Sequence, residues 1–159
     1  MTNTDKSQNV GKLAYTISTL GPVGFLPIAP GTWGSLVAVV IWWFFLAEQT
    51  LVFNLTIIAI LALVAVLLCE LAEKHIHKTD PGEIVIDEVI GQWITLLFCP
   101  HNLLFAFIGF ILFRLFDVLK PFPVGISQKL HGGWGIVIDD ILAGIYGLLV
   151  VVLLTRMIS

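Results

Sequence analysis

The stretch LVFNLTIIAILALVAVLLC, residues 51–69, decides the fold class of this chain. Its 19 residues include no charged side chain, and only Asn54 and Thr56 are strongly polar. As an α-helix the stretch would reach about 28 Å, close to the roughly 30 Å hydrocarbon core of a bilayer. The sequence therefore predicts a membrane-spanning helix at these residues.

The composition of the whole chain agrees with a membrane environment. Hydrophobic residues make up 58% of the 159 residues, charged residues only 12%, and the mean hydropathy is +1.00. Soluble domains carry about 25% charged residues, so this chain has roughly half the expected charge. The net charge of −3 leaves no basic footprint, and we expect no nucleic-acid partner.

Four further apolar segments lie outside the first span, at residues 34–47, 84–98, 103–116 and 136–154. The segment 34–47 is short for a crossing, so a tilted or half-buried helix is an alternative there. Whether 84–98 spans or is re-entrant stays open. We predict an all-α, polytopic integral membrane bundle with about four to five membrane-embedded helices. Residues 21–159 would form one membrane-embedded domain, and residues 1–20 a partly disordered cytoplasmic tail without the apolar core of a secretory signal.

The basic residues predict the orientation. They cluster before the first hairpin, after it and after the second hairpin, so the positive-inside rule places these three regions in the cytoplasm. The residues are Lys6, Lys12, Lys74, Lys78, Lys120 and Lys129, and only Arg156 disagrees. This membrane topology brings the acidic positions 80–88, 117 and 139–140 to one face of the membrane.

Two adjacent acid pairs lie in apolar surroundings. Asp87 and Glu88 lie in IVIDEVIG, and Asp139 and Asp140 lie in GIVIDDILAG. Charges beside a hydrophobic span are costly unless they are paired or bind something, which indicates function. Converging carboxylates favour a hard cation, Mg²⁺ or Mn²⁺, over zinc.

Asp80 is a further candidate ligand. Asp80, Glu83 and Asp87 are spaced to share one helical face if a helix starts at Asp80 as its N-cap, with Pro81 in the first turn. Helix capping or pairing with a nearby base is an equally good interpretation of Asp80 and Glu83.

Two other segments suggest phosphate binding. In FRLFDVLKPFP, Arg114, Asp117 and Lys120 share a helical face, and arginine and lysine both bind phosphate. Asp117 would orient one of them or join the metal site; the alternative is a local ladder of ion pairs. In the loop at 21–35, Gly31 would let backbone N–H groups approach an anion, and Thr32 or Ser35 would cap the following helix. A capped loop without ligand is the alternative there. Among the histidines, His131, beside the Gly132-Gly133 pair, is a minor candidate for the site.

Four stretches in this order resemble bacterial phosphatidylglycerophosphatase A. They are GFLPIAPGTWGSL (24–36), DPGEIVIDEVIG (80–91), FRLFDVLKPFPV (113–124) and GGWGIVIDDILAG (132–144). The resemblance covers most of the chain after residue 20. It implies a Mg²⁺-dependent enzyme of the bacterial inner membrane, whose catalytic domain would be residues 21–159. Its reaction would be hydrolysis of phosphatidylglycerophosphate to phosphatidylglycerol and phosphate, the last step of phosphatidylglycerol synthesis.

The resemblance fits a division of roles among the candidates. The metal ligands would be Asp87, Glu88, Asp139 and Asp140, and the phosphate-binding residues would be Gly31, Thr32, Arg114 and Lys120. The catalytic set would add Asp117 to the four acids. Water would attack the phosphate directly, or Asp117 or Asp139 would act as nucleophile through an aspartyl phosphate.

Two rival functions remain at this stage. A small cation or proton transporter also carries acids in its membrane segments, but there the acids should run through the depth of the bilayer rather than gather at one face. A catalytically dead scaffold is the other rival, and the intact acidic segments argue against it.

Overall fold

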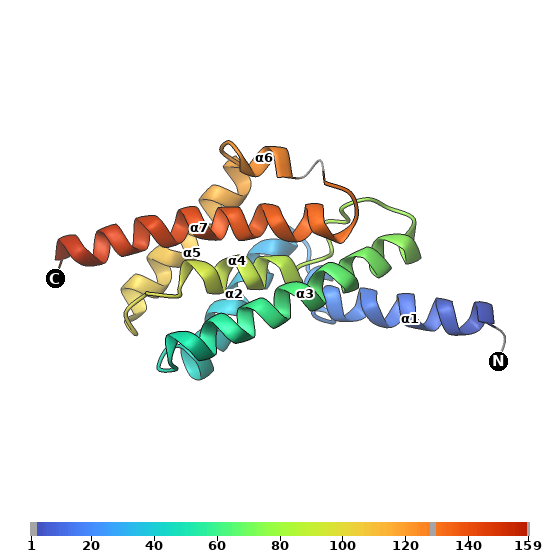
Figure 1. The fold of residues 1–159 in the computed structure, drawn as a ribbon, viewed down its shortest axis with the longest axis horizontal. Coiled ribbons are helices and arrows are strands. Elements are labelled where there is room, and N and C mark those ends of the chain that lie inside the picture. Colours follow the sequence, from blue (N-terminus) through green and yellow to red (C-terminus); the bar gives the residue numbers. More distant parts are fainter. Residues whose placement is uncertain (1–2, 128–129, 159) are drawn as a thin grey trace.

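The computed structural model describes residues 3–127 and 130–158, and the regular structure in these ranges is entirely helical. This confirms the predicted all-α class (Figure 1). The elements are α1 (Asn3–Ser18), a 3-10 turn η1 (Val23–Phe25), α2 (Pro30–Ile41), a π-helical segment η2 (Trp42–Leu46), α3 (Leu51–Ile76), α4 (Ile86–Thr95), α5 (Leu103–Leu119), α6 (Val124–Ser127) and α7 (Gly133–Ile158).

Two of the described helices are long and apolar enough to cross a bilayer. They are α3 and α7, each with 26 residues, and their most apolar windows have mean hydropathies of 2.9 and 2.4. At 1.5 Å per residue each reaches about 39 Å. The helix expected at residues 51–69 is therefore confirmed as part of α3. The segment Pro30–Leu46, which combines α2 and η2, is a shorter apolar helix.

Helix α3 is longer than its apolar core. It continues through the polar residues 70–76, where an exposed pair between Lys74 Nζ and Glu70 Oε1 (2.6 Å) connects successive turns. This extension gives α1 a surface to pack on, and Gly11 of α1 lies close against His75. Residues 3–18 are thus helical, and the expectation of a partly disordered tail is wrong for this range.

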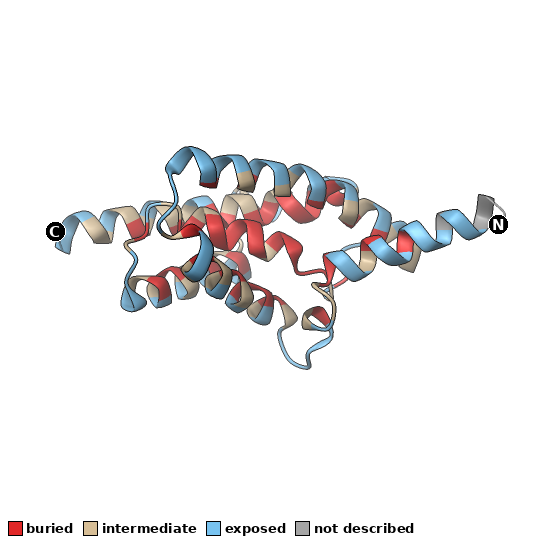
Figure 2. Ribbon diagram, turned by 90° about the horizontal axis from the view of Figure 1, so that it is seen from below, coloured by how far each residue is buried: buried red, intermediate tan, exposed pale blue. Residues whose placement is uncertain are grey.

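Helix α4 lies in the middle of the bundle (Figure 1) and is buried along most of its length (Figure 2). Its ten residues reach about 15 Å, too short to cross a bilayer. The indole N–H of Trp93 donates a hydrogen bond to the carbonyl oxygen of Ala38 in α2 (2.9 Å). The most extensive contact of α4 is with α7.

The contact between α4 and α7 depends on glycine. A side chain at Gly144 of α7 would overlap the carbonyl oxygen of Gly91 in α4, so the two backbones touch without intervening side chains. The hydroxyl of Thr95 donates to the carbonyl oxygens of both Gly91 and Gly144 (3.1 Å each). Small residues permit this close approach in membrane helices. The contact fixes the distance between the first turn of α4 and the facing turn of α7.

Two predicted helix starts are wrong. The helix α4 begins at Ile86, not near Asp80, because Val85 N–H donates to Ser18 O (2.9 Å) and holds the preceding segment against the end of α1. Asp80, Glu83 and Asp87 therefore do not share a helical face. The helix α2 begins at Pro30 with Ala29 as its N-cap, so neither Thr32 nor Ser35 is the cap.

Candidate active site

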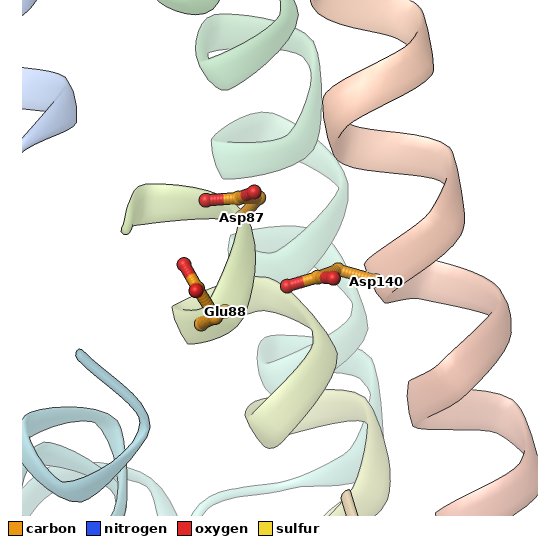
Figure 3. A group of neighbouring side chains, drawn as sticks. All are labelled: Asp87, Glu88 and Asp140. Carbon is orange, nitrogen blue, oxygen red and sulfur yellow. The ribbon is translucent and has the colours of Figure 1, made fainter. Parts of the chain in front are cut away.

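Three carboxylates from α4 and α7 lie together. Asp87 and Glu88 come from the first turn of α4, and Asp140 comes from α7. One oxygen of each lies within 4.8 Å of the others, and the three side chains converge (Figure 3). Asp87 and Asp140 are buried, and Glu88 is nearly so. We call these residues the three-acid group.

The three-acid group fits a divalent cation. Asp87 Oδ1, Glu88 Oε2 and Asp140 Oδ2 are each buried without a hydrogen-bond partner among the described residues. A buried oxygen of this kind is costly unless it is satisfied by something else, and three in one place multiply the cost. A purely oxygen ligand set is what hard cations such as Mg²⁺ prefer. The geometry thus indicates a cation site, without showing which ion binds.

Burial changes the acidity of the two acids on α4. It raises the pKa of Glu88 to about 8, and the charge of Asp140 raises it as well, although a hydrogen bond from Asp87 and the charge of Arg114 act in the opposite direction. Burial, followed by the neighbouring Glu88, raises the pKa of Asp87 well above its usual range. Both shifts show how unfavourable the charged forms are without a compensating positive charge.

A cavity of about 250 Å³ adjoins the three-acid group. We call it the acid cavity; its wall consists of Asp80, Pro81, Gly82, Ile84, Asp87, Glu88, Asp117, Val118, Lys120, Asp139 and Asp140. The acidic positions that the predicted membrane topology brings to one face therefore meet around one space, although they lie up to 60 residues apart in the sequence, from Asp80 to Asp140.

Asp139 has a different partner from Asp140. Its Oδ2 accepts a hydrogen bond from Lys120 Nζ at 2.5 Å, while its Oδ1 is buried without a partner. Asp139 therefore lies beside the three-acid group rather than within it, although the sequence placed both aspartates in the metal sphere. Lys120 reaches it because it ends α5 in a left-handed conformation (φ 43°). Burial lowers the pKa of Lys120, but the hydrogen bond and the surrounding carboxylates raise it more.

Arg114 lies behind the cavity and does not line it. Its Nη1 is 2.8 Å from Asp117 Oδ2 and 3.8 Å from Glu88 Oε1, and it donates to Ser35 Oγ at 3.4 Å. The structure thus brings Asp117 and Lys120 to the cavity wall but keeps the guanidinium, predicted to bind phosphate, among side chains of the protein. Arg114 is placed to hold Glu88 and Asp117 in position.

Gly31 and Thr32 also stay off the cavity wall. Gly31 is buried in the first turn of α2, and a Cβ there would overlap Glu88 Oε1 and lie 3.0 Å from Arg114 Nη1. The glycine therefore leaves room for the Glu88 carboxylate, a role different from the predicted backbone anion site.

We expect Gly31→Ala to displace Glu88 and weaken cation binding. The added methyl group would occupy the position of Glu88 Oε1, and the partly buried Arg114, whose Nη1 lies 3.0 Å from it, limits relaxation. The concentration of divalent cation that half-saturates the thermal stabilisation of the protein should rise about 10-fold, the lower end of the cost of disturbing a residue that supports a metal ligand. The control is Leu36→Ala on the outward face of α2, which should leave this midpoint unchanged. Equal midpoints for both variants would contradict the placement of Glu88.

Sequence reasoning missed the glycines that set the spacing of the site. Gly91 follows Glu88 by three residues and Gly144 follows Asp140 by four, so each acid pair has a glycine one turn later. This repeated spacing is the signal in the sequence from which the role of the glycines could have been predicted. It indicates two helices that touch near their acids, whereas the acids alone do not reveal the contact.

The fold and the site together define a class: helical proteins that enclose carboxylates between two closely packed helices. Within that class, the sequence identifies one family. The sequence profile of phosphatidylglycerophosphatase A matches residues 16–155, and the chain belongs to this family.

Three curated relatives are similar to the chain, and two of them carry the name of this family. Phosphatidylglycerophosphatase A of Escherichia coli (strain K12) is 40% identical over 124 residues, which cover 77% of this chain and 72% of that protein. Phosphatidylglycerophosphatase A of Haemophilus influenzae is 38% identical over 146 residues, covering 85% and 90%. A Bacteroides thetaiotaomicron protein provisionally named phosphatidylinositol-3-phosphatase is 35% identical over 134 residues, covering 80% and 84%. No solved structure matches the chain.

Proposed function

We propose that this protein hydrolyses phosphatidylglycerophosphate to phosphatidylglycerol and phosphate in a Mg²⁺-dependent reaction, the last step of phosphatidylglycerol synthesis. The observation that carries the proposal is the three-acid group in the wall of a cavity that also holds Lys120. Oxygen ligands for a cation and an ammonium group for a phosphate are what a phosphomonoester requires. The family and two of the relatives supply the lipid.

Asp87, Glu88 and Asp140 would hold the Mg²⁺, with Asp80 as a further wall residue within the same cavity. When bound, the ion supplies Lewis-acid chemistry by drawing charge from the phosphoryl oxygens. Arg114 positions Glu88 and Asp117 from behind through the contacts described above. We therefore assign Arg114 the support of these two carboxylates in place of the phosphate binding predicted from the sequence.

The remaining wall residues act on the substrate directly. Lys120 Nζ offsets the charge that builds up on the phosphoryl oxygens. Asp139 Oδ1, buried and without a partner, accepts a hydrogen bond from the attacking water and aligns it. The water oxygen forms the new bond to phosphorus and passes one proton to Asp139 Oδ1, while the bond from phosphorus to the glycerol oxygen breaks. The leaving glycerol oxygen takes up a proton from solvent, and Asp139 later returns its proton to solvent.

The route through an aspartyl phosphate remains the alternative, and the contacts favour Asp139 over Asp117 for it. Asp117 is held by Arg114, whereas Asp139 has one oxygen without a partner. Acid quenching during turnover followed by mass spectrometry distinguishes the routes. A phosphate adduct on the peptide that contains Asp139 would replace direct attack by water.

The proposed setting is the bacterial inner membrane, with the acid cavity at the cytoplasmic face. Two helices, α3 and α7, are long enough to span. In the proposed arrangement the apolar segment Pro30–Leu46 and α5 are embedded beside them, and α4 is enclosed by the others. The outward apolar side chains of α5, Leu104, Phe107 and Ile111, support this placement.

The experiment that tests the function measures phosphate release by detergent-purified protein from phosphatidylglycerophosphate, with Mg²⁺ and with EDTA. We expect release that requires Mg²⁺ and that Asp139→Ala lowers by about 100-fold or more, as for loss of a group acting in the transition state. Phosphatidylinositol 3-phosphate, included because of the Bacteroides relative, should be a poor substrate. Release from that lipid alone would replace the proposed substrate. Cation flux into liposomes without phosphate release from either lipid would favour the transporter.

A further inference from the structure

Helix α5 carries an apolar stripe on the outside of the bundle. Its exposed members are spaced three or four residues apart, which puts them on one face of the helix. They are Leu104, Phe107, Ile111, Leu115 and Val118, and Phe122 lies four residues beyond. We call these residues the α5 stripe.

The α5 stripe ends at the acid cavity. Val118 is 69% exposed and also lines that cavity. Two other wall residues lie near it in the sequence, the buried Asp117 and the partly exposed Lys120. Phe122, 78% exposed, lies just beyond. The surface thus changes from carboxylate to hydrocarbon within one residue, and the cavity meets the outside of the bundle at an apolar edge.

Toward α2, other residues of the protein pack against the three-acid group. Gly31 lies against Glu88, and Arg114 lies between Glu88 and Asp117 without lining the acid cavity. The exposed hydrophobic side chains Phe25 and Ile28 lie in the loop before α2, but neither lines the acid cavity. Among the large exposed hydrophobic residues that the structure describes, Val118 is the one that lines this cavity.

We propose that the acid cavity opens sideways to the membrane over Val118, and that the end of the α5 stripe seats the glycerolipid part of the substrate. This inference rests on the proposed function and deepens it. A cavity of about 250 Å³ accommodates a phosphate monoester and its glycerol but not two acyl chains. The chains must leave through the edge, and exposure of hydrocarbon to water there would be unfavourable. Leu115, Val118 and Phe122 offer them an apolar surface that begins where the charged wall ends.

The kinetic test compares two phosphatidylglycerophosphates, one with long acyl chains in mixed micelles and one with water-soluble butyryl chains. We expect Val118→Asn to lower the ratio of kcat/KM for the long-chain to the short-chain lipid by about 10-fold, the scale of one lost apolar contact. The control is Leu104→Asn at the other end of the stripe, which is equally a lipid-facing position and should leave the ratio unchanged. Equal ratios for the two variants would overturn the proposal while leaving the enzyme activity established.

A second measurement does not depend on turnover. The photoreactive residue p-benzoylphenylalanine is placed at position 118 or 104, and the protein is irradiated with Mg²⁺ in bilayers of phosphatidylcholine with tritiated phosphatidic acid, a diacyl phosphate monoester. We expect cross-linking of phosphatidic acid, relative to phosphatidylcholine, to be enriched several-fold at position 118 over position 104. Equal enrichment at both positions would show only general contact with bilayer lipid and would overturn the proposal. Absence of phosphate release from any substrate, with enrichment at position 118, would instead remove the proposed reaction and leave the lipid site.

Discussion

Asp140→Asn should eliminate Mg²⁺-dependent phosphate release and, with it, the stabilisation of the protein by Mg²⁺. Asp140 is the one member of the three-acid group that comes from α7, so its loss leaves a bound cation attached to α4 alone. Disturbing residues that merely support a metal ligand commonly costs 10- to 100-fold, so loss of a ligand should exceed about 100-fold. The measurement is phosphate release at saturating Mg²⁺, beside thermal unfolding with and without the ion.

The unfolding measurement gives this variant a signature that simple misfolding lacks. Without a cation, the asparagine removes one of three crowded acids, so the variant should unfold at a higher temperature than the unsubstituted protein in EDTA. With Mg²⁺ at about 100 times its dissociation constant, the unsubstituted protein gains about 2.7 kcal/mol and the variant should gain little. The order of the two proteins therefore reverses on adding Mg²⁺. Glu70→Gln, which removes an exposed acid outside the cavity, should leave both readouts unchanged.

Gly144→Ala should have the second-largest effect, although it replaces no polar group. An alanine in the middle of a helix normally stabilises it by about 0.5–1 kcal/mol relative to glycine. Here the new methyl group would overlap the Gly91 carbonyl oxygen and disturb the hydrogen bond from Thr95. Overpacking of this kind costs about 1–3 kcal/mol, so the net change should be destabilising.

The chemical consequence of Gly144→Ala follows from geometry. Pushing α7 away from α4 moves Asp140 from Asp87 and Glu88, and we expect phosphate release to fall about 100-fold, since an error of about 1 Å in placement has that effect. The control is Ile145→Phe, which adds volume at the next residue on a more exposed part of α7. Full activity and an unchanged unfolding temperature in Gly144→Ala would show that the two helices have room to move apart.

The sequence predicted the elements whose signal is local. The uncharged run at 51–69 is long enough to identify a helix on its own, and the apolar segment predicted at 103–116 lies within α5. The start of α4 was missed because Asp80 and Pro81 look like a helix cap and first turn. What prevails there is a tertiary contact, from Val85 to the end of α1, which no local pattern contains.

The candidate site was predictable as a set of residues but not as an arrangement. Asp139 and Asp140 are adjacent, and successive residues of a helix point about 100° apart, so both could not face α4 equally. Which one does depends on the contact of Gly91 with Gly144. In the same way, the i, i+3 spacing of Arg114 and Asp117 predicted their proximity, but the depth of Arg114 behind Glu88 depends on how α2 packs.

The contact between α4 and α7 also determines when the protein becomes competent during synthesis. Thr95 and Gly144 are 49 residues apart, and α7 leaves the ribosome after α4. A nascent chain that ends before residue 133 already contains Asp87 and Glu88 but has nothing to close the bundle around them. In the proposed membrane setting, insertion therefore passes through a stage at which the two acids of α4 lack their partner helix. Docking of α7 then completes the packing and the proposed cation site in a single event.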